Sequence, residues 1–183
     1  MTTNTMSWRD GIVGAILVAA ALAAQTHWMG PAIIFLSGGL VVAYLVWVAA
    51  RWRNDPAAVL PVYLLAIAVQ CLHFTEEYVT GFQHQFPELF GGHWSDAHFV
   101  TFNMLWLAVF VVAGLGVYRR VRLAYLIVVF LALIGGVGNG ISHLVLSTMY
   151  RRYFPGLLTA PFCLLLGIMV LTRLFAGSRA QQR

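Results

Sequence analysis

Two carboxylates and an imidazole stand together in an otherwise apolar part of the chain. Residues 70–78 read Gln-Cys-Leu-His-Phe-Thr-Glu-Glu-Tyr, so that His73 is followed by Glu76 and Glu77. In an α-helix, which turns by about 100° per residue, Glu76 lies about 60° to one side of His73 and Glu77 about 40° to the other. The three side chains therefore share one helical face, where they can bind a divalent metal or exchange protons.

A second polar face occurs nearer the C-terminus. Four residues there fall within about 100° of one another on a helical projection, namely Asn139, Ser142, His143 and Tyr150. Gly135 and Gly136 lie on the same face and allow another helix to approach closely. At about 1.5 Å per residue, His73 and His143 lie at the same depth, roughly 10 Å below the outer ends of their apolar segments. We therefore predict one buried cluster made of His73, Glu76, Glu77, Asn139 and His143.

Two histidines with one or two carboxylates are a recurrent ligand set for divalent metals. Zn²⁺ binds such a set with an open position for water, and non-haem Fe²⁺ binds it as a facial triad. The predicted cofactor is therefore a divalent metal, with Zn²⁺ placed before Fe²⁺. Its predicted ligands are His73, Glu76, Glu77 and His143, and the predicted catalytic residues are Glu76, Glu77 and Asn139. Two other interpretations stay open: a proton or ion relay, and a hydrogen-bond network that only clamps two helices together.

Polar segments at the same end supply candidate substrate-binding residues. Segment 80–98 contains three histidines, of which His98 comes closest to the following apolar segment. Another short polar segment carries Arg151 and Arg152 directly after Tyr150. We predict that His98, Tyr150 and this arginine pair bind the polar head of a substrate. The alternative for the two arginines is contact with lipid headgroups.

The composition requires a membrane to surround these residues. Of the 183 residues, 61% are hydrophobic and only 9% are charged, whereas about a quarter of the residues in a soluble domain are charged. A soluble globular protein is thereby excluded, and two cysteines are too few for a disulfide-stapled scaffold. The net charge of +5 comes from eleven arginines at the ends of apolar segments. This charge indicates membrane topology and gives no reason to expect nucleic acid as a partner.

The apolar segments predict an all-α fold, a six-helix transmembrane bundle in a single domain over residues 1–183. Spanning the hydrocarbon core takes about 20 apolar residues, and lipid satisfies no backbone polar groups, so each segment must be a helix. The six predicted helices are 11–29, 31–50, 57–79, 99–118, 122–149 and 156–175. Segment 80–98 is expected to be a structured loop.

The arginines predict the orientation in the inner membrane. With both termini cytoplasmic, nine of the eleven arginines lie at inner ends: Arg9, Arg51, Arg53, Arg119, Arg120, Arg122, Arg173, Arg179 and Arg183. This bias favours cytoplasmic termini. The alternative for residues 1–23 is a cleavable signal peptide, since a basic start, an apolar stretch and small residues are also typical of one.

The residues quoted above resemble the HXXEE family of small bacterial multipass membrane proteins. The family motif corresponds to His73-Phe74-Thr75-Glu76-Glu77. Two later elements are also similar, the pair Asn139 and His143 and the Tyr-x-Pro-Gly element at residues 153–156. The resemblance covers residues 57–175. It implies a multipass membrane protein, and the family name describes a motif and no reaction.

The leading functional prediction is a membrane-embedded metal-dependent enzyme. A hydrolase is the first choice and a non-haem iron oxidoreductase the second, because the ligand set fits both. The expected partners are membrane lipids and an amphiphilic small-molecule substrate with an apolar tail. The alternative is a proton-coupled transporter or relay that uses His73, Glu76 and Glu77. A third interpretation is a membrane subunit that only stabilises its partners.

Overall fold

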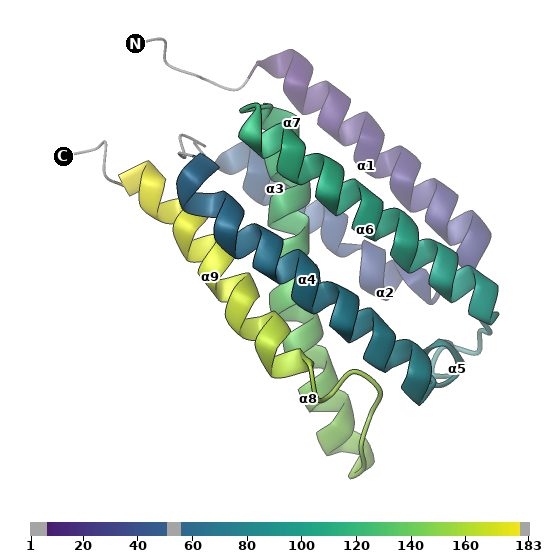
Figure 1. Cartoon of the computed structure of the whole chain (residues 1–183). Coiled ribbons are helices and arrows are strands. Elements are labelled where there is room, and N and C mark those ends of the chain that lie inside the picture. Colours follow the sequence, from purple (N-terminus) through teal and green to yellow (C-terminus); the bar gives the residue numbers. More distant parts are fainter. Residues whose placement is uncertain (1–6, 51–55, 180–183) are drawn as a thin grey trace.

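The computed structural model describes residues 7–50 and 56–179, and for 177–179 it describes the backbone alone. Within these ranges the chain is helical and contains no strand, which confirms the all-α prediction (Figure 1). The elements are α1 (Trp8–Met29), α2 (Ile33–Ser37), α3 (Gly39–Ala49), α4 (Pro56–Thr80), α5 (Phe82–Glu88), α6 (Asp96–Tyr118), α7 (Arg122–Phe130), the π-helix η1 (Leu131–Gly138), α8 (Asn139–Tyr150) and α9 (Ala160–Arg179).

Among the described residues, four helices are long and apolar enough to cross a membrane. They are Trp8–Met29, Pro56–Thr80, Asp96–Tyr118 and the continuous helix Arg122–Tyr150, which joins α7, η1 and α8. Two further apolar helices, Ile33–Ala49 and Ala160–Ala176, are shorter. The expected count of six full-length spans is therefore not matched, although each predicted segment is helical over most of its length. Three arginines used for the orientation, Arg51, Arg53 and Arg183, lie outside the described residues.

The second predicted span is divided at Gly38. Helix α2 ends at Ser37 and α3 begins at Gly39. A Cβ atom on Gly39 would overlap the side chain of Ile134 in η1. The glycine therefore lets α3 pack closely on the central helix at the point where the helical segment is interrupted.

The last predicted span begins later than expected. Helix α9 starts at Ala160, and residues 151–159 form a loop instead of the predicted first turn at residue 156. Gly156 has φ +91°, a left-handed conformation that no continuing α-helix contains. This loop covers the candidate site described below.

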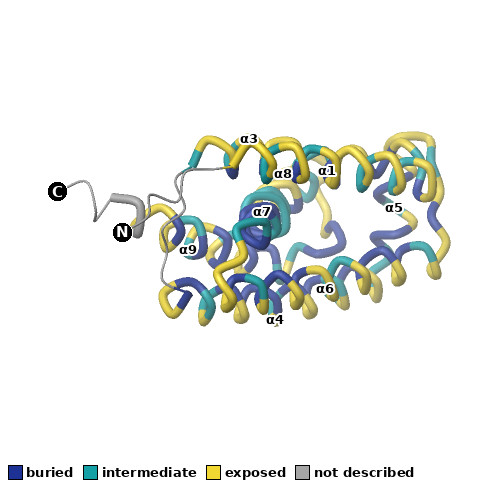
Figure 2. The backbone as a smooth tube through the Cα atoms, turned by 90° about the horizontal axis from the view of Figure 1, so that it is seen from above, coloured by how far each residue is buried: buried dark blue, intermediate teal, exposed yellow. Residues whose placement is uncertain are grey.

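The continuous helix α7–η1–α8 runs through the bundle (Figure 2), with α1, α3 and α6 packed on its α7 part and α9 packed on η1 and α8. Most of α7 is buried, whereas the surrounding helices expose many large apolar side chains on their outward faces. Outward-facing leucines and valines are what a helix in contact with lipid presents. Helices α1 and α4 begin, and α9 ends, at one end of the bundle; α5 and the loop before α9 lie at the other (Figure 1).

The π-helix sets the direction in which α8 presents its side chains. Its wider turn changes the angle between the residues before and after it. Gly136 then faces α9, where an added Cβ would lie 2.6 Å from Gly167 Cα, while Gly135 faces α4, where an added Cβ would lie 3.2 Å from Gln70 Oε1. The two glycines thus allow close approach of different helices, and α8 continues with His143 directed towards α4.

Candidate metal centre

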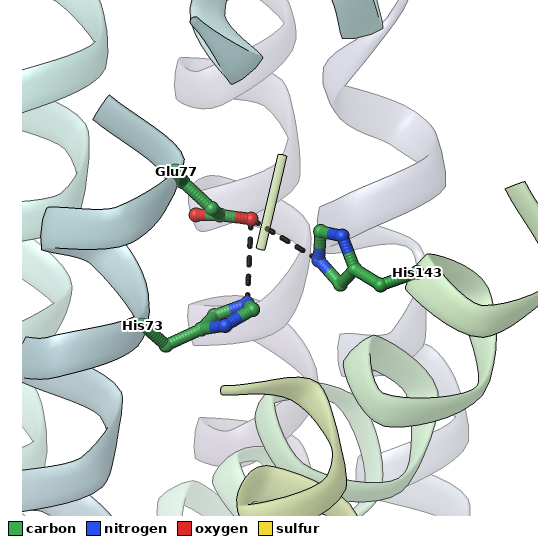
Figure 3. Close-up of side chains that lie close together, drawn as sticks. All are labelled: His73, Glu77 and His143. Carbon is green, nitrogen blue, oxygen red and sulfur yellow. Dashed lines mark ion pairs between the residues drawn. The ribbon is translucent and has the colours of Figure 1, made fainter. Parts of the chain in front are cut away.

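Three buried side chains from two helices converge at the end of the bundle that carries α5. His73 and Glu77 lie one turn apart on α4, and His143 projects from α8 (Figure 3). Their exposed fractions are 0%, 4% and 1%. Glu77 Oε1 lies 3.4 Å from His73 Nε2 and 3.3 Å from His143 Nε2. One ligand atom from each of the three residues lies within 4.8 Å of the other two, so the group could hold a metal ion.

Glu76 faces away from this group and binds the loop between α8 and α9. Its Oε1 accepts hydrogen bonds from the Tyr153 hydroxyl at 2.5 Å and the Leu158 N–H at 2.8 Å. Its Oε2 accepts from both the N–H and the hydroxyl of Thr159, at 2.8 and 2.5 Å. In the described part of the chain, four donors hydrogen-bond to this carboxylate, which is the environment of an ionised group. Glu76, predicted as a ligand and catalytic residue, therefore lies outside the group of three and contacts the loop.

The hydroxyl of Thr159 links His73 to Glu76. Its hydroxyl donates to Glu76 Oε2 and lies 2.7 Å from His73 Nδ1. Since the hydroxyl proton is used on the carboxylate, the oxygen accepts from His73, which assigns a proton to Nδ1. His73 Nε2 then faces Glu77 and has no hydrogen-bond partner within residues 7–50 and 56–179. Metal-bound histidines are commonly oriented in this way, by a hydrogen bond from the ring nitrogen that does not bind the metal.

The backbone of the loop closes over both imidazoles at Gly156. A Cβ atom on this residue would lie 2.5 Å from His143 Cε1 and 2.9 Å from His73 Cε1. Next to it, the fully buried Phe154 packs on His143, with ring centroids 6.1 Å apart. Burial, together with the hydrogen bond to the Glu76 carboxylate, raises the pKa of Tyr153, so this hydroxyl remains a donor at neutral pH. The Tyr-x-Pro-Gly element is thus the cover of the cluster.

A small cavity adjoins Glu77, and neither His73 nor His143 lines it. Its volume is about 50 Å³, which is room for a few water molecules. Its polar lining residues are Ser37, Gln70, Glu77, Asn103 and Asn139. Asn139, predicted as catalytic, therefore lies at this cavity and outside the group of three. The Nδ2 of Asn103 is buried and has no hydrogen-bond partner in the part of the chain that the structure describes.

The predicted substrate-binding residues lie apart from the cluster. Arg151 ends α8 in a left-handed conformation, and the guanidinium of Arg152 lies 5.8 Å from the Tyr150 ring centroid. Tyr150 in turn stacks on Phe154 at 6.2 Å. His98 contacts the Trp28 ring edge-on at 5.5 Å. The role of these four residues in substrate binding stays a prediction.

Several residues that contact the site had no predicted role, among them Tyr153, Gly156 and Thr159. Tyr153 and Gly156 belong to the element that carried the family resemblance, which is the signal that could have placed them at the site. Thr159 stood as an isolated polar residue in a predicted apolar span, the position at which a buried hydroxyl needs a partner.

Comparison with known proteins gives one match. A family model described as "Protein of unknown function with HXXEE motif" matches residues 64–171, a range that contains the motif, His143 and the covering loop. No curated protein and no solved structure matches the chain.

Proposed function

The chain belongs to the HXXEE family of proteins of unknown function, and we propose that it is a membrane-embedded, zinc-dependent hydrolase. The proposed ligands are His73, Glu77 and His143. The observation that carries the proposal is the buried pair formed by His73 Nε2 and Glu77 Oε1. With the ring proton on Nδ1, a neutral His73 directs a lone pair at a carboxylate oxygen 3.4 Å away. Two buried acceptors at this distance are stabilised by a cation, either a metal ion between them or a second proton on His73.

The distances favour a tetrahedral metal. At bond lengths near 2.0–2.1 Å, a tetrahedral ion separates its ligand atoms by about 3.3–3.4 Å. Two of the three separations, 3.4 and 3.3 Å, have this value, whereas the third lies within 4.8 Å, so the two imidazoles must move closer together when an ion binds. An octahedral ion at similar bond lengths separates adjacent ligands by only about 3.0 Å. Zn²⁺ is therefore the first choice, and Fe²⁺ in a facial triad is the second.

Three protein ligands on Zn²⁺ leave a fourth position for water. A zinc ion with an open position supplies a hydroxide near neutral pH by lowering the pKa of that water. The polar cavity beside Glu77 provides space for it, with Gln70 and Asn139 in its wall. We assign these two amides to orienting the water or a substrate carbonyl. Glu76 orients His73 through Thr159 and takes no proton from the water.

The position in the membrane follows from the ends of the helices. Arg9 lies in the first turn of α1, Arg119 and Arg120 follow α6, and Arg122 begins α7, all at the end opposite the cluster. We propose that this end is cytoplasmic in the inner membrane, in keeping with the bias of arginine towards inner loops. The site then lies in the outer half of the bundle.

The transporter alternative receives less support. Along the buried face of α4, the residues from Gln70 towards the opposite end are Ile67, Ala66, Tyr63 and Val59. The Tyr63 hydroxyl is itself bound to the Phe110 carbonyl at 2.9 Å. Along this described stretch of α4, an apolar core separates the polar cavity from the other end, which favours a site open to one side.

Metal analysis tests the proposal. We expect the purified chain to contain about one zinc per chain, and His73→Ala and His143→Ala to contain little or none, because three ligands hold the ion. His98→Ala is the matched control, a histidine at the same end of the bundle that belongs to no ligand group, and it should retain the metal. A panel of acyl esters then tests hydrolysis. Absence of stoichiometric metal in the wild-type chain, or unchanged metal in His73→Ala, would refute the proposal.

A further inference from the structure

An apolar groove lies between α1 and α6, beside the polar cavity. Both helices pack on α7, and the groove between them has a volume of about 450 Å³. Its walls carry Leu17, Val18 and Ala21 from α1, Leu105 and Val109 from α6, and Leu126 from α7. Gln25 is the one amide side chain among the lining residues. Leu17, Leu105 and Val109 are exposed at the mouth, so in a membrane the groove opens sideways to lipid.

This groove and the cavity at the candidate metal centre are neighbours that share two lining residues. Phe102 and Trp106 line both spaces. Gln25 lines the groove and accepts a hydrogen bond from Ser37, which lines the cavity. A change of side-chain rotamer at Trp106 can join the two spaces, because this side chain lines both. One molecule can then occupy both.

An unpaired donor marks the polar end of this path. Asn103 is buried, lines the cavity, and its Nδ2 has no hydrogen-bond partner among the described residues. Buried amide donors are almost always paired, so this group calls for an acceptor oxygen. No arginine appears among the residues that line the groove or the cavity. The head group that fits is therefore small, uncharged and rich in oxygen, such as an ester or a hydroxyl.

From these observations we propose that the chain binds a neutral amphiphile with a single hydrocarbon chain, which enters sideways between α1 and α6 and places its head beside Asn103 and Glu77. At roughly 30 Å³ for each water-sized group, the groove holds about 15 chain carbons. That is one chain and not the two of a phospholipid. Trp28, at the end of the groove nearest α5, contacts the His98 ring, and the lateral mouth between α1 and α6 is the proposed entrance.

The inference rests on the proposed function only in placing the head group at the candidate metal centre, since binding of the chain needs no metal. The test uses the purified full chain in lipid nanodiscs with a photoactivatable monoacylglycerol that carries a diazirine in its acyl chain. Mass spectrometry of the cross-linked peptides should locate the label on Leu105, Val109 and Leu126. Unlabelled monoolein should compete with the probe, and dioleoylphosphatidylglycerol should not.

Two variants and a control decide the outcome. Ala21→Trp fills the groove and should reduce cross-linking at least tenfold, and Asn103→Leu should weaken competition by monoolein several-fold. Val112→Trp places the same bulk on an exposed face of α6 outside the groove and should behave like the wild type. Retained zinc content in Ala21→Trp, or an unchanged melting temperature, shows that this variant is folded. Equal labelling of Ala21→Trp and Val112→Trp, or equal competition by the phospholipid, would overturn the inference.

This experiment distinguishes a failure of the hydrolase proposal from a failure of the amphiphile site. His73→Ala should lose the metal and keep the cross-links in the groove, because the chain-binding residues are unchanged. A protein without zinc that still binds the probe refutes the hydrolase and leaves the amphiphile site. A protein with zinc that labels only its outward faces refutes the amphiphile site and leaves the metal centre.

Discussion

Replacement of Glu76 by glutamine should loosen the loop that covers the candidate metal centre. Each carboxylate oxygen accepts two hydrogen bonds from residues 153–159. In Glu76→Gln one oxygen becomes an NH₂ group, which cannot accept a hydrogen bond. In either orientation of the amide, two hydrogen bonds are lost, and the NH₂ group faces a backbone N–H, which is also a donor. A hydrogen bond to a charged group contributes about 1.5–3 kcal/mol, and the partial exposure of Glu76 favours the lower value.

The loss of two such bonds corresponds to about 3 kcal/mol in the free energy of unfolding. For a chain of this length the melting temperature should fall by about 6–12 °C. The assay is thermal unfolding of the metal-free protein in detergent, so that metal binding does not contribute. Amide hydrogen exchange of the peptide over residues 153–160 should accelerate at the same time, because the Leu158 and Thr159 N–H groups lose their acceptor or its charge.

Glu88→Gln is the control, since Glu88 is an exposed glutamate on α5 at the same end of the bundle. The interpretation of Glu76 as the anchor of the loop is refuted if both variants unfold at the wild-type temperature and exchange in the loop is unchanged. Glu77→Gln gives the complementary result: it should remove the metal and leave exchange in this loop close to that of the metal-free wild type, because Glu77 makes no hydrogen bond to the loop among the interactions of the described residues.

Two further variants test the contacts of the loop with the histidines. Gly156→Ala should destabilise the protein by about 2–5 kcal/mol in chemical or thermal unfolding, because a left-handed φ and overlap with two imidazoles add. Gly91→Ala, with φ +67° and nothing within 4 Å of its added Cβ, should cost only about 1–2 kcal/mol for the conformation, and equal costs would contradict the proposed contact. Thr159→Val should weaken zinc binding by about 10–100-fold in competition with a chelator, since His73 loses its orienting acceptor. Thr159→Ser keeps the hydroxyl and should bind like the wild type; weak binding by both would indicate a role for the methyl group instead.

The all-α class and the pairing of His73 with His143 could be predicted, because both follow from the pattern of apolar and polar residues along the helices. Apolar segments without alternation in a membrane leave only helices. The convergence of His73 with His143 followed from two polar faces at one depth. The break at Gly38 and the π-helix before Asn139 could not be predicted, because both arise from packing of the central helix against α3 and α9, through close approaches at Gly39 and Gly136. A helical projection at a fixed 100° per residue takes no account of such contacts between helices.

The roles of the two glutamates could not be separated by a helical projection either. Glu76 and Glu77 lie about 60° and 40° from His73, and both angles allow a shared site. The choice depends on what faces each carboxylate, and for Glu76 this is a loop of four donors that begins more than seventy residues later in the chain. Only the fold brings these donors to α4.

The arrangement gives a physical reason for two adjacent glutamates after one histidine. His73 has two ring nitrogens on opposite sides of the imidazole, and each is directed at a different carboxylate. Nε2 faces Glu77 directly at 3.4 Å, and Nδ1 reaches Glu76 through the hydroxyl of Thr159. Residues three and four positions after His73 lie on either side of it, so one turn of helix supplies a ligand partner on one side and an orienting partner on the other. Exchange of Glu77 for an apolar residue should therefore leave Nε2 without its carboxylate and cause loss of the metal. Exchange of Glu76 should leave Nδ1 without its support and detach the covering loop.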